Sequence, residues 1–201
     1  MINIIKDIDL YEHFNEYDFI LIGTGINCMM TQGIQRDIML NYPYVQNENM
    51  KTKYGDKSKL GTILECKEEG QPTFILLFIY TANQRPDLNP VYVSYESIEK
   101  CLKIVNILYK GCKVATTMLG CSRFDGNGDK DTVLELLKKY STNINLDVYD
   151  FEQKSRAEKL KEIRQNELKL KEENIDAYYE TVRKRKEEAE RRKENNGHAR
   201  Y

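Results

Sequence analysis

Two glycine-bearing loops carry the residue types that could do chemistry in this sequence. The first spans residues 23–33 and contains Asn27, and the second spans residues 119–129 and contains Asp125 and Asp129. Each loop follows an apolar run of strand length. Glycine lets the backbone approach a ligand closely, and the backbone N–H groups of such loops, together with the start of a following helix, bind anions. The two loops therefore predict a phosphate- or nucleotide-binding α/β domain whose ligand lies at the carboxyl ends of strands.

Asp125 is the best candidate for a catalytic carboxylate. Hydrolysis of a phosphate ester or a glycosidic bond needs a group that orients or deprotonates water. Asp129 is a competitor, four residues further along the chain. Both residues belong to the run Asp-Gly-Asn-Gly-Asp, which is also an ordinary turn sequence, and Asp131 could cap the helix that follows. The sequence leaves these alternatives open.

Strand-like and helix-like segments alternate over the first three quarters of the chain, and these elements would hold the two loops in place. The expected strands are residues 2–5, 18–22, 60–66, 73–81, 113–119 and 146–151; the expected helices are residues 33–40, 94–108 and 131–140, with a short helix or turn at 10–15 and a loop from Pro43 to Asn49. This alternation is typical of an α/β fold with a mixed, mostly parallel sheet and helices on both faces. Ser94 is expected to cap the second of these helices.

The composition changes near residue 152, so the expected domains are residues 1–152 and a charged tail, residues 153–201. Residues 155–194 contain no Gly or Pro and many Lys, Arg and Glu, which predicts one long charged helix. Leu168, Ile175, Val182 and Ala189 recur every seven residues, but the companion positions are mostly polar. A solvated helix with ion pairs is therefore expected; docking on a protein partner, self-association and a nucleic-acid arm are less favoured alternatives.

The overall composition excludes several classes of function. The net charge of -1 gives no sign of nucleic-acid or membrane binding, and no apolar run is long enough to span a membrane. The five cysteines are odd in number and lack metal-site spacing, so reduced thiols and a cytoplasmic location are expected. We expect no metal, no cofactor and no membrane partner.

Several short motifs, in their order and spacing, resemble the macro domains, a family that binds ADP-ribose. The motifs are Lys6-Asp7-Ile8 for the family's G-D-I turn, Asn27-Cys28 with Gly33-Ile34 and Tyr42-Pro43, Tyr54-Gly55 with Lys59-Leu60-Gly61, and Leu119-Gly120-Cys121 with Asp125-Gly126. The resemblance covers residues 1–151 and is closest to the branch of ADP-ribose 1''-phosphate phosphatases and small ADP-ribosyl glycohydrolases. It implies a three-layer macro-domain-like fold.

The resemblance also implies a ligand-binding role for each matching residue. Asp7 would accept a hydrogen bond from the adenine amino group, or else cap its own turn. Asn27 would contact the distal ribose and take part in catalysis with Asp125, or else stabilise its own turn. The remaining expected binding residues are Ile8 in the turn after the first strand, Gly25, Gly33 and Ile34 around the first loop, Gly120, Cys121 and Ser122 in the second diphosphate loop, and Phe124, which would stack on or shield the distal ribose, or else belong to the core.

Three departures from the family pattern bear on catalysis. Ser122-Arg123 replaces the second glycine of the second loop, Gly23-Thr24 stands where phosphatase-like relatives can carry a histidine, and residues 80–84 lack the lysine of some glycohydrolases. The expected function is a metal-free hydrolase acting on the terminal ribose of an ADP-ribose derivative. The alternatives are a non-catalytic ADP-ribose-binding module with a helical interaction tail, and a scaffold for that tail. The leaving group, the true substrate, the oligomeric state and the tail's partner stay open.

Overall fold

The computed structural model describes residues 2–81, 91–122 and 126–150, together with positions 165, 168, 169, 180, 183, 184 and 187. The chain divides into two units, Met1–Glu152 and Gln153–Tyr201. Arg123, Phe124 and Asp125 lie outside the described residues, and so do residues 82–90.

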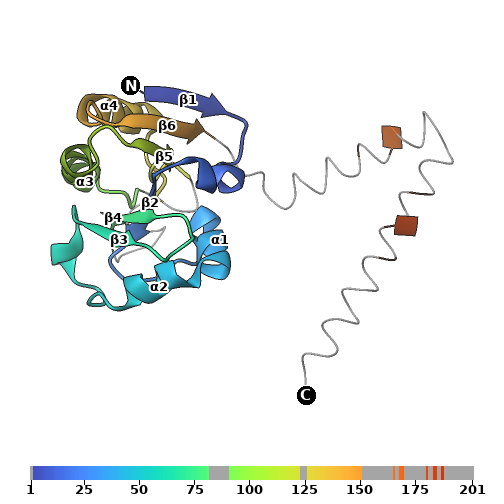
Figure 1. The fold of residues 1–201 in the computed structure, drawn as a ribbon, viewed down its shortest axis with the longest axis horizontal. Helices are drawn as coiled ribbons and strands as arrows, with labels where there is room; N and C mark the ends of the chain where they lie inside the picture. The colour runs from blue at the N-terminus through green and yellow to red at the C-terminus, as the bar shows by residue number, and fades with distance from the viewer. Residues whose placement is uncertain are drawn as a thin grey trace, which may run out of the picture. The chain divides into compact units, whose positions relative to one another are not determined.

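A six-stranded sheet in the order β1-β6-β5-β2-β4-β3 forms the centre of the first unit (Figure 1). The strands are β1 (Ile2–Lys6), β2 (Phe19–Gly25), β3 (Ile63–Cys66), β4 (Phe74–Tyr80), β5 (Lys113–Thr117) and β6 (Asn145–Asp150). Five of them run parallel, and β3 pairs antiparallel with β4 at one edge. This confirms the predicted mixed, mostly parallel sheet, and it places the carboxyl ends of the five parallel strands along the same edge.

Helices cover both faces of the sheet (Figure 1). On one face α3 (Tyr95–Leu108) and α4 (Lys130–Tyr140) pack against the sheet, with Ile98, Leu102 and Leu137 fully buried. On the other face lie the 3₁₀ helix η1 (Leu10–Glu16), α1 (Gly33–Asn41) and α2 (Pro43–Met50). Alternate residues of β2 and β4 point to the two faces, so a strand such as β4 is buried over its whole length. The three-layer α/β architecture is therefore as predicted.

The segment from Pro43 to Asn49 is helical, and the prediction of a loop there was wrong. Helix α2 begins at Pro43, whose fixed φ and missing N–H suit the first turn of a helix. Tyr44, Val45 and Asn49 are buried against the core, so tertiary packing stabilises a segment of weak helix propensity.

Side-chain caps define where two other helices begin. Ser94 caps α3 by accepting a hydrogen bond from the backbone of Ser97, as predicted. Asp129, and not Asp131, caps α4: its carboxylate accepts hydrogen bonds from the backbone N–H and the hydroxyl of Thr132, at 2.8 and 2.6 Å. A short 3₁₀ turn, η2 (Lys57–Lys59), lies before β3, and Asp56 caps it by accepting a hydrogen bond from the backbone N–H of Ser58.

The described positions of the tail unit are helical and exposed. Arg183 lies 3.0 Å from Glu180 and 3.8 Å from Glu187, and Lys184 lies 4.0 Å from Glu180, all at helical spacing. These ion pairs agree with the prediction of a solvated helix at these positions. None of the described helices has the length and apolar character needed to cross a membrane.

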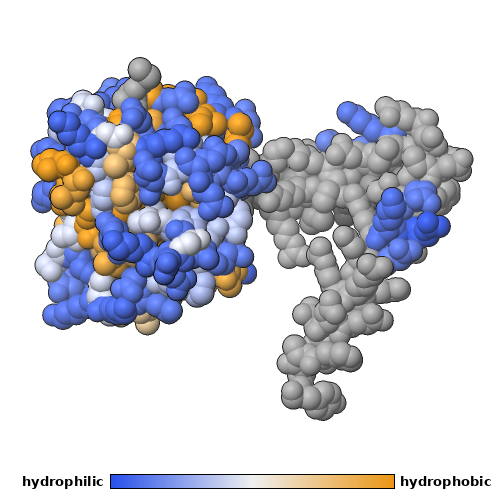
Figure 2. Space-filling view, in the orientation of Figure 1, coloured by the Kyte–Doolittle hydropathy of each residue, from blue (hydrophilic) through white to orange (hydrophobic). Residues whose placement is uncertain are grey.

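The surface of the first unit is mostly hydrophilic on the face drawn in Figure 2, with apolar residues in smaller patches.

Candidate functional site

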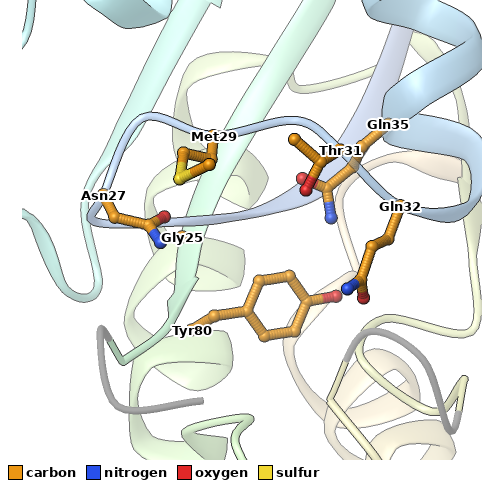
Figure 3. Close-up of a pocket in the computed structure, with 7 residues that line it drawn as sticks. All are labelled: Gly25, Asn27, Met29, Thr31, Gln32, Gln35 and Tyr80. Carbon is orange, nitrogen blue, oxygen red and sulfur yellow. The ribbon is translucent and has the colours of Figure 1, made fainter.

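A pocket lies at the carboxyl ends of β2 and β4, against the beginning of α1 (Figure 3). It is lined by Gly25, Asn27, Met29, Thr31, Gln32, Gln35 and Tyr80. Its volume is about 80 Å³, whereas pockets that hold a whole small molecule measure roughly 300–1,000 Å³. The pocket can therefore hold one part of a nucleotide-sized ligand. It lies where an open α/β sheet places its binding crevice.

A β-bulge places Tyr80 in this pocket. Thr24 pairs with Phe78, but the next residue of β2, Gly25, pairs with Tyr80, so the register of β2 and β4 shifts by one residue. Because strand side chains alternate between faces, this shift changes the side to which Tyr80 points. Its ring is 4 % exposed and lies with the core cluster that includes Val93 and Leu119.

Close packing around Tyr80 helps to explain why glycines occupy both loops. A Cβ atom at Gly126 would lie 2.5 Å from Gly120 O and 2.9 Å from Tyr80 Cε1, and one at Gly23 would lie 2.6 Å from Ile79 Cδ1 and 3.0 Å from the Tyr80 hydroxyl. At Gly120, where φ is +70°, a Cβ atom would lie 2.5 Å from Val93 Cγ2 and 3.3 Å from the Tyr80 ring. Packing against Tyr80 and Val93 is thus a reason for these glycines that is independent of any ligand.

Asn27 bends back over the end of β2. A Cβ atom at Gly25 would lie 2.8 Å from Asn27 Oδ1, and the next residue, Cys28, has a left-handed backbone with φ of 56°. The carbonyl oxygen of Cys28 accepts a hydrogen bond from Gln46 Nε2 at 3.0 Å, which ties the loop to α2. The pocket is therefore lined at this side by an amide that can both donate and accept hydrogen bonds.

The first turn of α1 forms another wall. Gly33 starts the helix with φ of +51°, and the preceding residue, Gln32, makes no side-chain capping hydrogen bond. The first N–H groups of a helix lack partners within it. Gln35 in this turn is only 6 % exposed and lines the pocket, and Figure 3 draws its amide beside Thr31. Ile34 is partly buried and packs against the core.

The second loop is held by its own backbone. The N–H groups of Gly126 and Asn127 donate to Ser122 O at 3.0 and 2.9 Å, and that of Gly128 donates to Gly120 O at 2.8 Å. The N–H of Cys121 donates to Met118 O, and burial raises the pKa of the Cys121 thiol to about 12. Cys121 is therefore a neutral thiol at neutral pH.

Asp129 has a structural role that competes with catalysis. The hydrogen bonds from Thr132 hold the pKa of this carboxyl below its ordinary value, and the Asp129 N–H donates to the Tyr95 hydroxyl at 2.8 Å. A general base needs a free lone pair and a suitable pKa, so the geometry favours the helix-cap interpretation of Asp129. The placement of Asp125 and Phe124 lies outside the described residues.

Asp7 lies at the end of β1 and not beside the pocket lining. It is exposed, its φ is 60°, and its N–H donates to Asp150 O at 3.4 Å. The carboxylate that caps the following 3₁₀ helix belongs to Asp9, which accepts from Tyr11 N at 3.1 Å. Ile8 is 44 % exposed. The side chains of Asp7 and Ile8 are thus exposed to solvent at the carboxyl edge of the sheet.

Five pocket-lining residues were missing from the prediction: Met29, Thr31, Gln32, Gln35 and Tyr80. Gln35 carried a weak signal, because it is a polar residue beside the apolar positions of a helix. Tyr80 carried none, because the bulge that redirects it has no mark in the sequence. Within the described part of the chain, no group of three or more His, Cys, Asp or Glu could hold a metal ion.

Comparisons with known proteins identify the fold. No protein-family model matches the sequence, and no curated protein does. A protein of unknown function from Bacteroides thetaiotaomicron is 15 % identical with a TM-score of 0.59, over 75 % of this chain and 98 % of the other. Thermosipho africanus DarTG, solved in complex with ADP-ribose, is 17 % identical with a TM-score of 0.56, over 76 % of this chain and 42 % of the other. The macrodomain of Mycobacterium tuberculosis DarG is 15 % identical with a TM-score of 0.56, over 76 % and 99 %. The chain therefore has the macrodomain fold.

Proposed function

We propose that the first unit binds ADP-ribose or a derivative of it and hydrolyses a bond at the terminal ribose. The observation that carries the proposal is the pocket between Asn27 and the uncapped first turn of α1. The free N–H groups of a helix N-terminus and the helix dipole attract phosphate oxygens. The amides of Asn27 and Gln35 suit the hydroxyl groups of a sugar.

The strand order supports a ligand that is extended along the carboxyl edge of the sheet. Asp7 follows β1 and Asn27 follows β2, and β6 and β5 lie between these strands. Three strand spacings place the two strand ends about 14 Å apart. An adenine near Asp7 and a terminal ribose near Asn27 would thus be joined by the diphosphate across the ends of β6 and β5. Thermosipho africanus DarTG, which shares this fold, was solved with ADP-ribose.

The catalytic part of the proposal rests on Asp125. Its neighbour Gly126 packs against Tyr80, and Tyr80 lines the pocket. In the proposed reaction the carboxylate of Asp125 aligns a water molecule and accepts its proton, while Asn27 orients the ribose. A positioned general base contributes about 100- to 10,000-fold in rate. The proposed reaction uses no metal ion.

Calorimetry followed by a turnover assay tests both parts. We expect ADP-ribose to bind with micromolar affinity, of order -8 kcal/mol, and the wild type to release phosphate from ADP-ribose 1''-phosphate or a group from an ADP-ribosylated peptide. Asp125→Asn should remove turnover and leave ADP-ribose binding nearly intact, because the carboxylate acts mainly in the transition state. Equal turnover by the variant, or loss of turnover on adding a chelator, would contradict the mechanism.

A non-catalytic binding module is the second candidate. Among the described residues that line the pocket there is no Asp, Glu, His or Lys, and catalysis of hydrolysis usually requires such a group. Binding of ADP-ribose without turnover of either substrate would support this candidate. In that case we would propose that the charged tail, residues 155–194, contacts a protein partner or a second copy of this chain.

A further inference from the structure

Lys59 is a buried lysine whose hydrogen-bonding partners are a thiol and a hydroxyl. Its side chain is 9 % exposed. The Nζ atom lies 3.1 Å from Cys28 Sγ and 2.9 Å from Thr52 Oγ1, and it lies 4.8 Å from the centre of the Phe78 ring. No carboxylate among the described residues lies within ion-pair distance of this amine. Buried charges in proteins are almost always paired with an opposite charge, so this lysine is unusual.

The contact between Lys59 and Cys28 is fixed from several sides. Cys28 is 2 % exposed, and its carbonyl oxygen is held by Gln46. Its thiol also lies 3.2 Å from Thr52 Oγ1, which itself donates to Asn49 O at 2.7 Å. Lys59 is the last residue of η2, whose backbone turn is closed by Asp56. The amine nitrogen and the sulfur are thus held at contact distance before any reaction.

We propose that Cys28 and Lys59 form a covalent sulfur–nitrogen cross-link when the protein is oxidised by hydrogen peroxide. The thiol first attacks the peroxide, the O–O bond breaks, and Cys28 becomes a sulfenic acid with release of water. The ammonium group of Lys59 passes one proton to solvent, and its nitrogen then attacks the sulfur. The S–O bond breaks, and a second water leaves with a further proton from the nitrogen. Apart from the proton passed to solvent, the protein loses two hydrogens, the sulfur is oxidised by two electrons, and the peroxide is reduced to two waters.

The other four cysteines lack this arrangement. The thiols of Cys66 and Cys101 donate to backbone carbonyl oxygens, and burial raises the pKa of each to about 12. The Cys121 thiol donates to Leu119 O. Of the five cysteines, all of which lie among the described residues, Cys28 alone has a lysine amine within hydrogen-bonding distance. Among the described residues, no lysine amine lies within hydrogen-bonding distance of the other four sulfurs, so the cross-link should be specific to Cys28.

Peptide mapping of the full chain tests the proposal. Trypsin cuts after lysine and arginine, so Cys28 falls in the peptide of residues 7–36, and loss of cleavage at Lys59 leaves residues 58–67 together. After treatment with hydrogen peroxide, we expect these two peptides to appear joined, with a mass two hydrogens below their sum. Dithiothreitol should separate them, because a thiol attacks the sulfur and releases the amine.

Two variants serve as matched controls. Lys59→Arg keeps the positive charge and the donors but lacks the amine, and Cys28→Ser keeps a small polar group but lacks the sulfur. Both should lose the joined peptides, and circular dichroism should show that both are folded. The proposal is overturned if wild-type Cys28 ends as sulfinic or sulfonic acid with no joined peptide, or if it stays reduced while the partly exposed Cys112 is oxidised. Because the mapping uses wild-type protein, a variant that fails to fold leaves the test intact.

Discussion

The amide oxygen of Asn27 lies over Gly25, so close that a Cβ atom at Gly25 would be 2.8 Å away from it. Both residues line the pocket. The φ angle of Gly25 is not positive, so its backbone does not require a glycine. The missing side chain instead leaves the space that the amide of Asn27 occupies. The glycine that ends β2 is therefore part of what orients the amide proposed to contact ribose.

Gly25→Ala should displace the Asn27 amide and weaken ADP-ribose binding about tenfold, which corresponds to about 1.4 kcal/mol. The effect should depend on Asn27. In an Asn27→Ala background, the added Gly25→Ala change should cost almost nothing, and calorimetric titration of the four proteins gives this coupling. Additive losses would show that Gly25 and Asn27 act independently and that the close contact has no part in binding.

Gly120→Ala should destabilise the fold through contact with Val93, independently of ligand. Gly111 provides a matched control, because it also has a positive φ, +84°, but a Cβ atom there would meet nothing within 4 Å. Both changes carry backbone strain, but Gly120→Ala adds overpacking, which typically costs about 1–3 kcal/mol. Urea denaturation of both variants isolates that difference. Equal losses of unfolding free energy would mean that the structure around Val93 relaxes freely.

The order of the strands and helices was predictable from the sequence because each apolar run has a length and period typical of one element. The central strands β2 and β4 are apolar over long runs, and Ser94 marks the start of α3. Helix α2 was missed because its sequence, rich in Asn and begun by Pro43, is also typical of a loop. Only the burial of Tyr44 and Val45 by the rest of the fold decides in favour of a helix.

The loop of residues 23–33 contributes most of the pocket lining, whereas none of the described residues of the second loop lines the pocket. Gly25 and Asn27, two of the residues expected from the motifs, are among the lining, and their roles in binding stay predictions. Tyr80 enters the pocket because of a register shift between β2 and β4, and pairing register depends on both strands at once. The helix cap at Asp129 could have been expected from the Thr132 that follows three residues later. The role assigned to Asp125 stays a prediction.

Gln35→Met should weaken ligand binding while leaving the fold as stable as before, or slightly more so. Gln35 is 6 % exposed and lines the pocket, and its side-chain amide makes no hydrogen bond with the described residues. A methionine of similar shape keeps the packing of this helical turn but removes the amide from the pocket lining. We expect about three- to tenfold weaker ADP-ribose binding with an unchanged or higher thermal midpoint. Clear destabilisation without loss of binding would assign Gln35 to the core.

The carboxylate of Asp129 should make the free energy of unfolding depend on pH in the acid range. The hydrogen bonds from Thr132 lower its pKa in the folded state from the ordinary value of 3.8. A group whose pKa is lower in the folded than in the unfolded state stabilises the fold above the unfolded value, and this contribution is lost as the pH falls through the folded value. Asp129→Asn keeps a capping oxygen but removes the charge. Wild type should therefore be more stable than the variant above about pH 5, and the difference should shrink as the pH is lowered below 3.8.

Asp131→Asn is the matched control, because Asp131 lies in the same helical turn and makes no capping hydrogen bond. Urea denaturation at several pH values gives both comparisons, and the same pH dependence in wild type and Asp129→Asn would show that this cap carries no charge-dependent stability.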